Sequence, residues 1–192
     1  MNRCDECTGF ATISEQLINK NIMDSNLRIA LARPSDFDNY IGLLEEIAEW
    51  LESRGLGQVR PGTYRQFADY FAASIAAEEV YLGLIDDKIA GSFRLVHDGG
   101  IVWPDADADA LYLENLVVRR AWGGRGLGRQ LVLWAERETL RLGKTSLRLD
   151  CFASNPVLRR YYENAGYEEC GEIDAQYEFG VLRLQRYQKR LR

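Results

Sequence analysis

The sequence predicts a single α/β domain built on a mixed, mostly antiparallel sheet of about seven strands flanked by about four helices. Short runs rich in β-branched and aromatic residues alternate with longer segments of helical periodicity. No internal repeat or low-complexity linker divides them. The composition, with 46% apolar and 28% charged residues among 192, is that of an ordinary globular chain with one core.

Residues 1–26 are expected to form an N-terminal extension that is poorly ordered or holds one short helix, and residues 27–192 are expected to form the domain. The domain's predicted elements are, in order, a strand over 27–32, a helix from Pro34 to about Gly55, a helix capped by Thr63, strands over 80–85, 88–96 and 110–118, a helix over 126–142, a strand over 146–151, a short helix between Asn155 and Gly166, and two strands within 167–187.

Turn and cap residues set these boundaries. Asp86 and Asp87 separate two β-rich runs and predict a hairpin turn. Gly143 supplies a helix stop, and Asn155 followed by Pro156 is the pattern of an N-cap with proline in the first helical turn. The hairpin turn at Asp86 and Asp87 further predicts that the strands over 80–85 and 88–96 are antiparallel.

The charge and hydropathy of the chain indicate which kinds of binding partner to expect. A net charge of −5 and a pI near 5.1 give no electrostatic footprint for nucleic acid and fit a cationic or amine-bearing partner better. No apolar run approaches 18 residues, and no basic-then-apolar leader is present. We expect a cytoplasmic protein without a membrane partner, as a monomer or homodimer.

A metal site is not expected. Cys4 and Cys7 form a C-x-x-C, but it lacks a preceding strand and a second pair at zinc-finger spacing, so metal or redox function there is the minor alternative. Cys151 and Cys170 stand apart from it, and His97 is the one histidine of the chain.

Four glycines fall within six residues, from Gly123 to Gly128, between an apolar strand and a long amphipathic helix. Glycine adopts positive φ and brings no side chain, so successive N–H groups can surround an anion at the helix N-terminus. A dinucleotide G-x-G-x-x-G fails at Arg129, and a P-loop is a near miss because Arg129 and Gln130 replace its Lys-Ser/Thr pair. A tight turn that binds nothing is the remaining alternative.

The stretch Arg125-Gly126-Leu127-Gly128 resembles the pyrophosphate loop of the GNAT superfamily, the acyl-CoA-dependent N-acetyltransferases. The stretch from Asn155 to Tyr167 resembles that family's second signature, with Tyr162 seven residues after Asn155. The order of predicted elements extends the resemblance from about Leu27 to the C-terminus. Gly123 departs from the family pattern, which has glutamine or arginine there, so a phosphate clamp would pass to Arg125 or Arg129.

The resemblance implies a GNAT-like fold, acetyl-CoA as co-substrate, no metal, and roles for particular residues. Asn155 is expected near the pantetheine arm, and Tyr162 near the sulfur as general acid. The remaining expected cofactor contacts are those of the strand end and the glycine loop, namely Leu116, Val117, Val118, Gly123, Gly124, Arg125, Gly126, Leu127, Gly128 and Arg129.

Each catalytic assignment has a plainer alternative. Tyr162 is a phenol that can protonate a thiolate, but it also lies in an apolar stripe with Leu158 and Tyr161 and can be a core residue. On an ideal strand Glu114 shares a face with Val118, which makes it the candidate base, acting through water. The alternative is a structural ion pair.

The acceptor is the least determined part. Acidic residues in the loop before the cofactor strand, at Asp98, Asp105, Asp107 and Asp109, either attract a cationic amine or are simply solvated. Trp50, Trp103 and Tyr64 are equally compatible with acceptor walls and with core packing.

The predicted function is transfer of an acetyl group from acetyl-CoA to a primary amine of a small molecule or peptide, by direct attack in a ternary complex. A non-catalytic acyl-CoA-binding or regulatory module is the alternative, and a nucleotide-hydrolysing enzyme is disfavoured by the missing Lys-Ser/Thr pair.

Overall fold

The computed structural model describes residues 26–56, 59–105, 107–177 and 180–192. The expectation of an N-terminal extension and the Cys4–Cys7 pair lie outside the described residues. No helix in the described part of the chain is both long and apolar enough to cross a membrane.

Seven strands and five α-helices are described. The strands are β1 (Arg28–Leu31), β2 (Val80–Ile85), β3 (Lys88–Val96), β4 (Ala110–Val118), β5 (Ser146–Phe152), β6 (Glu168–Tyr177) and β7 (Gly180–Arg190). The helices are α2 (Phe37–Ser53), α3 (Thr63–Gln66), α4 (Ala68–Ala76), α5 (Leu127–Arg141) and α6 (Pro156–Asn164), with short 3₁₀ turns η1 (Pro34–Asp36), η2 (Gly100–Val102) and η3 (Arg120–Trp122).

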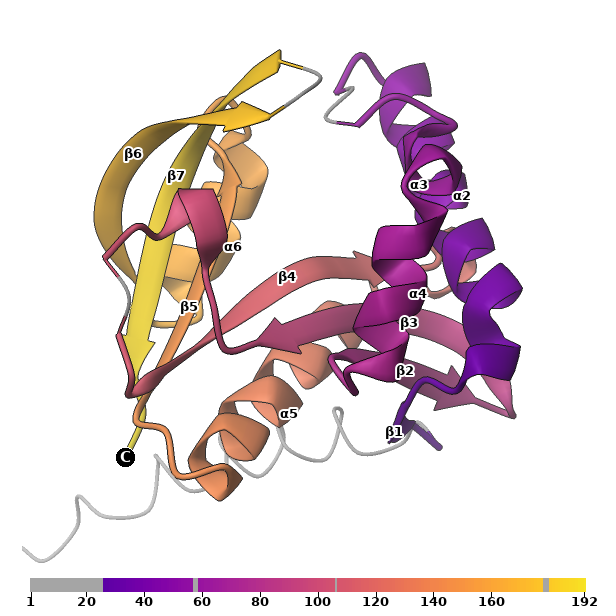
Figure 1. Ribbon diagram of the computed structural model, residues 1–192, viewed down its shortest axis with the longest axis horizontal. Helices are drawn as coiled ribbons and strands as arrows, with labels where there is room; N and C mark the ends of the chain where they lie inside the picture. Colours follow the sequence, from indigo (N-terminus) through magenta and orange to yellow (C-terminus); the bar gives the residue numbers. More distant parts are fainter. Residues whose placement is uncertain (1–25, 57–58, 106, 178–179) are drawn as a thin grey trace, which may run out of the picture.

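All strands form one sheet of order β1-β2-β3-β4-β5-β7-β6. Neighbouring strands are antiparallel except β4 and β5, which run parallel and pair only from Ala110–Ser146 to Leu113–Leu149. Beyond Leu113 and Leu149 the two strands part. The sheet therefore has a fork at its centre, which separates a β1–β4 half from a β5–β7 half (Figure 1).

Helices cover both faces of the sheet (Figure 1). The largest core cluster packs α5 and α6 against one face, with Leu131 of α5 and Tyr162 of α6 among its members. On the opposite face, α2 and α4 pack over β2 through Ile41 and Phe71. The loop around η2 packs with the β6–β7 hairpin over β4 through Trp103. The fork thus lies between two separately built halves.

The predicted fold class and strand count are confirmed. Asp86 and Asp87 both adopt positive φ, at 50° and 59°, as the predicted tight hairpin turn requires. The predicted N-cap is wrong at Thr63: Gly62 occupies that position at φ 89°, and the segment forms two helices that meet at Phe67. Glu45 of α2 accepts hydrogen bonds from the amides of Gly62 and Arg65, so a distant carboxylate caps this helix.

Candidate active site

The glycine loop leads from β4 into α5 with a run of unused amides. Gly124 and Gly126 adopt φ of 74° and 76°, and nothing lies within 4 Å of a Cβ built on either residue. After Gly123, the next amide with a main-chain acceptor is that of Gln130 in α5, which donates to Gly126 O at 3.2 Å. In the described part of the chain, the amides from Gly124 to Arg129 have no such acceptor. A helix N-terminus with free donors suits an anion.

Gly123 differs from the expectation that its amide joins this cradle. Its N–H donates to Arg120 O at 3.0 Å, so the free run begins at Gly124. The side chains of Arg125 and Arg129 are exposed beside the loop, and Arg125 lies 5.2 Å from the ring centre of Trp122. Both remain available to a phosphate.

The open edge of β4 lies beside the fork. Val117 and Val118 pair with Ser92 and Gly91 of β3, but beyond Leu113 no residue of β4 pairs with β5 in the described sheet. The main chain from Leu116 to Val118 therefore offers hydrogen-bonding groups to a ligand that enters the fork.

A β-bulge overturns the expectation that Glu114 and Val118 share a face. Asn115 adopts φ 49°, and the register with β3 shifts here. As a result Leu113, Leu116 and Val118 all face the cluster beneath α5. Glu114 points to the other face, towards Arg94. The expectation for an ideal strand is wrong here because the extra residue of the bulge reverses which face of the sheet the following side chains point to.

Asn155 begins α6 and is buried. Its side-chain oxygen accepts a hydrogen bond from the Leu158 amide at 3.1 Å, which confirms the predicted N-cap. The oxygen is thereby occupied, while the NH₂ group has no partner in the described part of the chain. It can donate to a carbonyl.

Tyr162 lies on α6 with 5% of its surface exposed, in edge contact with Tyr161 and Tyr167. Burial raises the pKa of Tyr162 far above its ordinary value, so the phenol stays protonated at neutral pH. No hydrogen-bond partner of its hydroxyl is found among the described residues. Tyr162 is thus both a core residue and a free proton donor, so its two predicted roles are compatible.

Tyr161 adds a feature that sequence reasoning missed. Its hydroxyl is buried without a hydrogen-bond partner and lies 3.5 Å from a Cβ built on Gly128. The Tyr161 hydroxyl is therefore an unused hydrogen-bonding group between α5 and α6, next to the glycine loop. The signal for this was present in the sequence as a tyrosine in an otherwise apolar stripe.

A charged cluster occupies the other side of the fork. Arg94 of β3 is 4% exposed, and it binds Glu114 at 2.9 Å and Glu79 at 2.7 Å. It also donates to the Tyr70 hydroxyl at 2.5 Å. Burial raises the pKa of Glu114 although the Arg94 charge opposes the shift. The ion-pair alternative is therefore correct for Glu114, and it leaves the base role untested.

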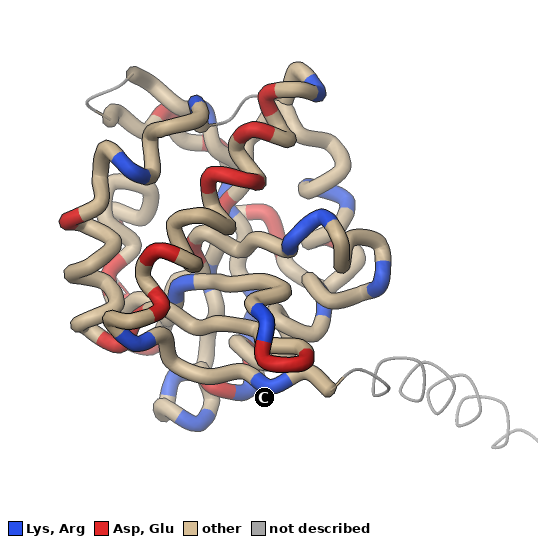
Figure 2. The backbone as a smooth tube through the Cα atoms, turned by 90° about the vertical axis from the view of Figure 1, so that its right-hand side faces the viewer, with Lys and Arg blue, Asp and Glu red and all other residues tan. Residues whose placement is uncertain are grey.

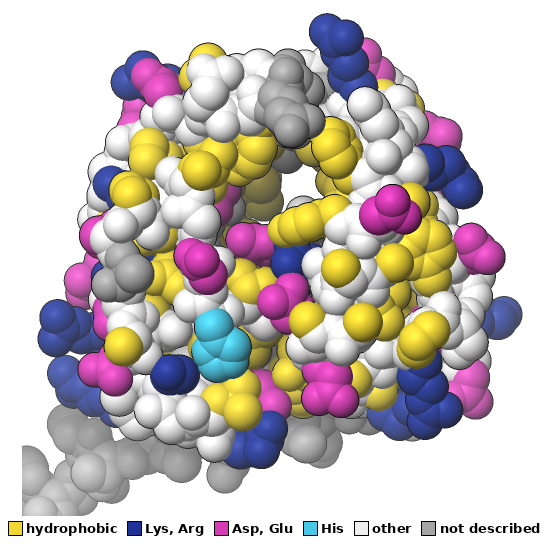
Figure 3. Space-filling view, viewed as in Figure 1, with side chains coloured by type: hydrophobic (Ala, Val, Ile, Leu, Met, Phe, Trp, Pro, Cys, Tyr) yellow, Lys and Arg dark blue, Asp and Glu magenta, His cyan; other side chains and the backbone are white. Residues whose placement is uncertain are grey.

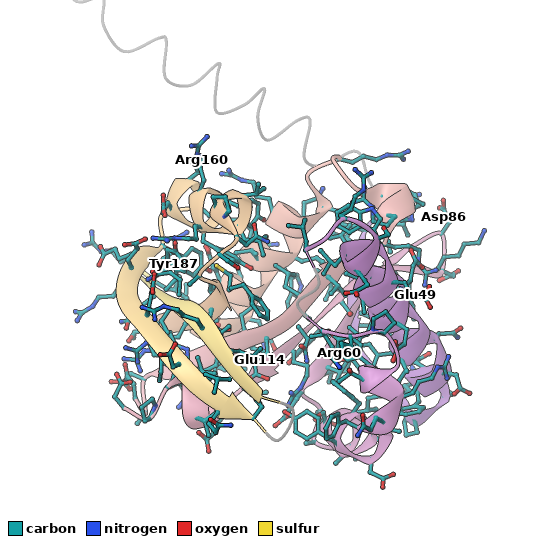
Figure 4. All side chains as sticks on the ribbon, turned by 90° about the horizontal axis from the view of Figure 1, so that it is seen from above. Glu49, Arg60, Asp86, Glu114, Arg160 and Tyr187 are labelled. Carbon is teal, nitrogen blue, oxygen red and sulfur yellow. The ribbon has the colours of Figure 1, made fainter. Side chains whose placement is uncertain are left out.

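This cluster faces a hollow in the molecular surface. Figure 3 shows the hollow between the β6–β7 hairpin and the α2–α4 side, with charged and hydrophobic side chains on its floor. In Figure 4 Glu114 lies between the hairpin and the loop that carries Arg60, whereas Arg160 lies on the outer side of α6.

Three of the four acidic loop residues, Asp98, Asp105 and Asp109, are exposed as the solvated-loop alternative expects, and most of the four also have partners within the protein. Asp105 and Asp107 bind Arg148, at 3.6 Å and 3.2 Å. Asp98 accepts from the Gly100 amide. Trp103 is buried in the core, with the guanidinium of Arg148 4.8 Å from its ring centre. These residues stabilise the fold of the loop.

Tyr64 and Trp50, the other two aromatic residues considered as walls of an acceptor site, also have structural partners. Tyr64 packs against Phe71, and burial raises the pKa of Tyr64 to about 12. Arg120 stacks on Trp50, 3.8 Å from its ring centre. Figure 2 shows acidic positions along the helices. On α2, Glu46 binds Arg119 at 2.9 Å. These contacts attach the start of the glycine loop to α2.

Asp150 is a further carboxylate that sequence reasoning missed. It follows Leu149, the last β5 residue paired with β4, and so stands at the fork. Burial raises the pKa of Asp150 to about 7, and the charge of Glu114 adds to the shift. An acidic residue in the middle of an otherwise buried strand was the available signal. No group of three or more metal-ligating side chains occurs among the described residues.

The fork, the glycine loop and the motif from Asn155 to Tyr167 that contains α6 together define an acyl-CoA-dependent acyltransferase fold. Residues 43–167 match the model of the Acetyltransferase (GNAT) family. Since this match covers more than half of the chain, the protein belongs to the GNAT family of N-acetyltransferases, as the sequence resemblance predicted.

Individual relatives agree with this assignment. The chain is 32% identical over 141 residues to the "Uncharacterized N-acetyltransferase YesJ" of Bacillus subtilis (strain 168), covering 71% of this chain and 78% of the relative. A GNAT acetyltransferase from Listeria monocytogenes superimposes with a TM-score of 0.72 at 23% identity, covering 88% and 99% of the two chains. A putative acetyltransferase from Salmonella typhimurium, solved with acetyl-CoA, gives 0.63 at 19% identity, covering 88% and 95%.

Proposed function

We propose that this enzyme transfers an acetyl group from acetyl-CoA to a primary amine of a small molecule or peptide, by direct attack in a ternary complex. The observation that carries the proposal is the fork. It joins a run of free amides and a protonated tyrosine on one side to a carboxylate-lined hollow on the other. A thioester reaching through the fork would meet an amine that enters from the hollow.

The donor side fits acetyl-CoA. The free amides from Gly124 to Arg129 would hold the pyrophosphate, and Arg125 and Arg129 would add charge. Asn155 and the β4 edge from Leu116 to Val118 would bind the pantetheine arm. The Salmonella relative was solved with acetyl-CoA, which supports the same donor for this chain. Acetyl-CoA supplies the reactive thioester; the chain positions it.

Catalysis would rest on positioning and proton transfer. Tyr162 donates a proton to the departing sulfur, since its raised pKa keeps the hydroxyl protonated. A main-chain amide of the β4 edge stabilises the carbonyl oxygen as negative charge develops there. A carboxylate on the hollow side of the fork would receive a proton from the acceptor through water; Glu114 is the candidate that the sequence predicts, and burial raises the pKa of this carboxyl.

The test is release of the CoA thiol from acetyl-CoA in the presence of a panel of primary amines, namely alkylamines, diamines and amino-acid amides. We expect turnover that depends on the amine and saturates with both substrates, with both bound before release. CoA binding without amine-dependent release would instead identify a non-catalytic binding module. A cytoplasmic location belongs to the same proposal and is tested by fractionating the producing cell.

A further inference from the structure

Two carboxylates stand at equivalent positions on the two arms of the fork. Leu113 and Leu149 form the last residue pair between β4 and β5, and Glu114 and Asp150 are the next residue on each strand. Leu113 and Leu149 both face the cluster beneath α5 and α6. Because side chains alternate along a strand, Glu114 and Asp150 both face the opposite side, towards the acceptor hollow.

The two carboxylates differ in their partners. Glu114 binds Arg94 at 2.9 Å. Asp150 has neither a hydrogen bond nor an ion pair within the described residues. A carboxylate that is largely buried and unpaired is costly to the fold, so its retention at the fork requires a reason beyond packing.

The cations near Asp150 are engaged elsewhere. Arg186, its neighbour on β7, binds Asp105 at 3.5 Å and the Cys170 carbonyl at 3.1 Å. Arg148, two residues before it on β5, binds Asp105 and Asp107. Neither guanidinium neutralises Asp150.

The other titratable groups whose charge interacts with that of Asp150 are acids. They are Glu114 on β4, Tyr177 on β6 and, from the opposite face of the sheet, Tyr162 on α6 and Cys151 on β5. Burial, reinforced by Glu114, raises the pKa of Asp150 to about 7, near the pH at which a general base acts most effectively.

We propose that Asp150 is the catalytic residue that takes the proton from the acceptor ammonium, and that Glu114, held by Arg94 at the matching position of β4, is its positioning residue. This inference rests on the proposed acetyl transfer and goes beyond it by moving the base from β4 to β5.

The protons balance as follows. One proton passes from the ammonium to the Asp150 carboxylate, which leaves a neutral amine. The amine lone pair forms the C–N bond, and the C–S bond breaks with its electrons on sulfur. Sulfur receives a proton from Tyr162, and the nitrogen loses its second proton, which restores Tyr162. Asp150 returns its proton to solvent, so the products are the amide, the CoA thiol and one proton.

The test is the pH profile of kcat/KM for the best amine of the panel, measured for the wild type, Asp150→Asn and Glu114→Gln. We expect a wild-type profile that rises through about pH 7 and a loss of kcat in Asp150→Asn of about 100-fold or more, without the rise. In Glu114→Gln the rise should move to lower pH, because a neighbouring negative charge has been removed. Asp87→Asn, on the exposed β2–β3 turn, is the matched control and should behave as wild type.

A raised KM with unchanged kcat in Asp150→Asn would overturn the proposal, because it would make Asp150 a binding contact. An unchanged pH profile in either variant would overturn it as well. A wild type that releases no CoA thiol with any amine would instead refute the proposed acetyl transfer, so the two failures are distinguishable.

Thermal unfolding supplies a measurement that does not depend on turnover. A carboxyl whose pKa is raised on folding binds its proton more tightly in the native state, so the native state loses stability as pH rises from about 4 to about 7. Asp150→Asn should therefore melt higher than wild type at pH 8, and this advantage should vanish at pH 4. A variant that melts lower than wild type at pH 8 would show that the carboxylate is structural and would overturn the proposal.

Discussion

The two sides of the fork are built from different parts of the chain. On the proposed donor side the groups free to bind a ligand are main-chain groups and one asparagine, supplied by the end of β4 and the starts of α5 and α6. On the acceptor side they are the side chains of Arg94, Glu114 and Asp150, from three different strands. Substitutions that change backbone conformation should therefore weaken CoA binding on the donor side. Substitutions that change charge should affect stability and turnover through the acceptor side.

The largest effect is expected for Arg94→Met. Arg94 is buried, and its loss leaves Glu79 and Glu114 facing each other without a cation. Breaking a buried ion network by removing one partner costs about 3 kcal/mol, allowing for the partial exposure of the two carboxylates. Chemical denaturation measures this loss of unfolding free energy.

Arg28→Met is the matched control, because Arg28 binds Asp87 in a pair with both side chains more than half exposed. Its loss should cost less than about 1 kcal/mol. Equal losses in the two variants would contradict the view that the acceptor side depends on a buried charge network.

Tyr162→Phe should lower kcat by about 100-fold, equivalent to about 2.7 kcal/mol, because the ring is retained and only the proton donor is removed. The affinity for CoA should not change. Steady-state kinetics and CoA titration separate the two effects. Tyr81→Phe, a buried tyrosine of β2 stacked on Phe93, should retain full activity. Full activity of Tyr162→Phe across the pH range would exclude the acid role.

This difference in construction also explains what the sequence could predict. The glycine loop, the Asn155 cap and the Asp86–Asp87 turn are local signals, since backbone conformation there depends on a few adjacent residues. All three are present as predicted.

The acceptor side was not predictable in the same way. The bulge at Asn115 carries no glycine to mark it, yet it reverses the face of every residue that follows on β4. The contacts of Arg94 with Glu79 and Glu114 join residues 15 and 20 positions apart. Asp150 lies at the fork because β4 and β5 separate after Leu149, and the point of separation depends on the pairing of the whole sheet.

A conformational test of the donor side is Gly126→Ala. Gly126 has φ 76°, where any Cβ costs about 1–2 kcal/mol, so the loop should relax and the CoA affinity should fall about tenfold. Isothermal titration with CoA measures the fall. Gly143 has φ 75° at the other end of α5, also with open space around it. Gly143→Ala should therefore lose similar stability but keep CoA binding, and an equal loss of affinity in both variants would refute a role for the loop amides.

The smallest effect separates the two functions of one side chain. Asn155→Ala removes both the cap on Leu158 and the free NH₂ group, so it should cost about 1 kcal/mol of stability and weaken CoA binding. Asn155→Asp keeps the accepting oxygen and adds a charge that is favourable at a helix N-terminus, so stability should be preserved. CoA binding should still weaken, because the NH₂ group that we propose as the donor to the pantetheine arm is gone. If Asn155→Asp binds CoA as tightly as wild type, Asn155 acts on the donor side through backbone conformation alone.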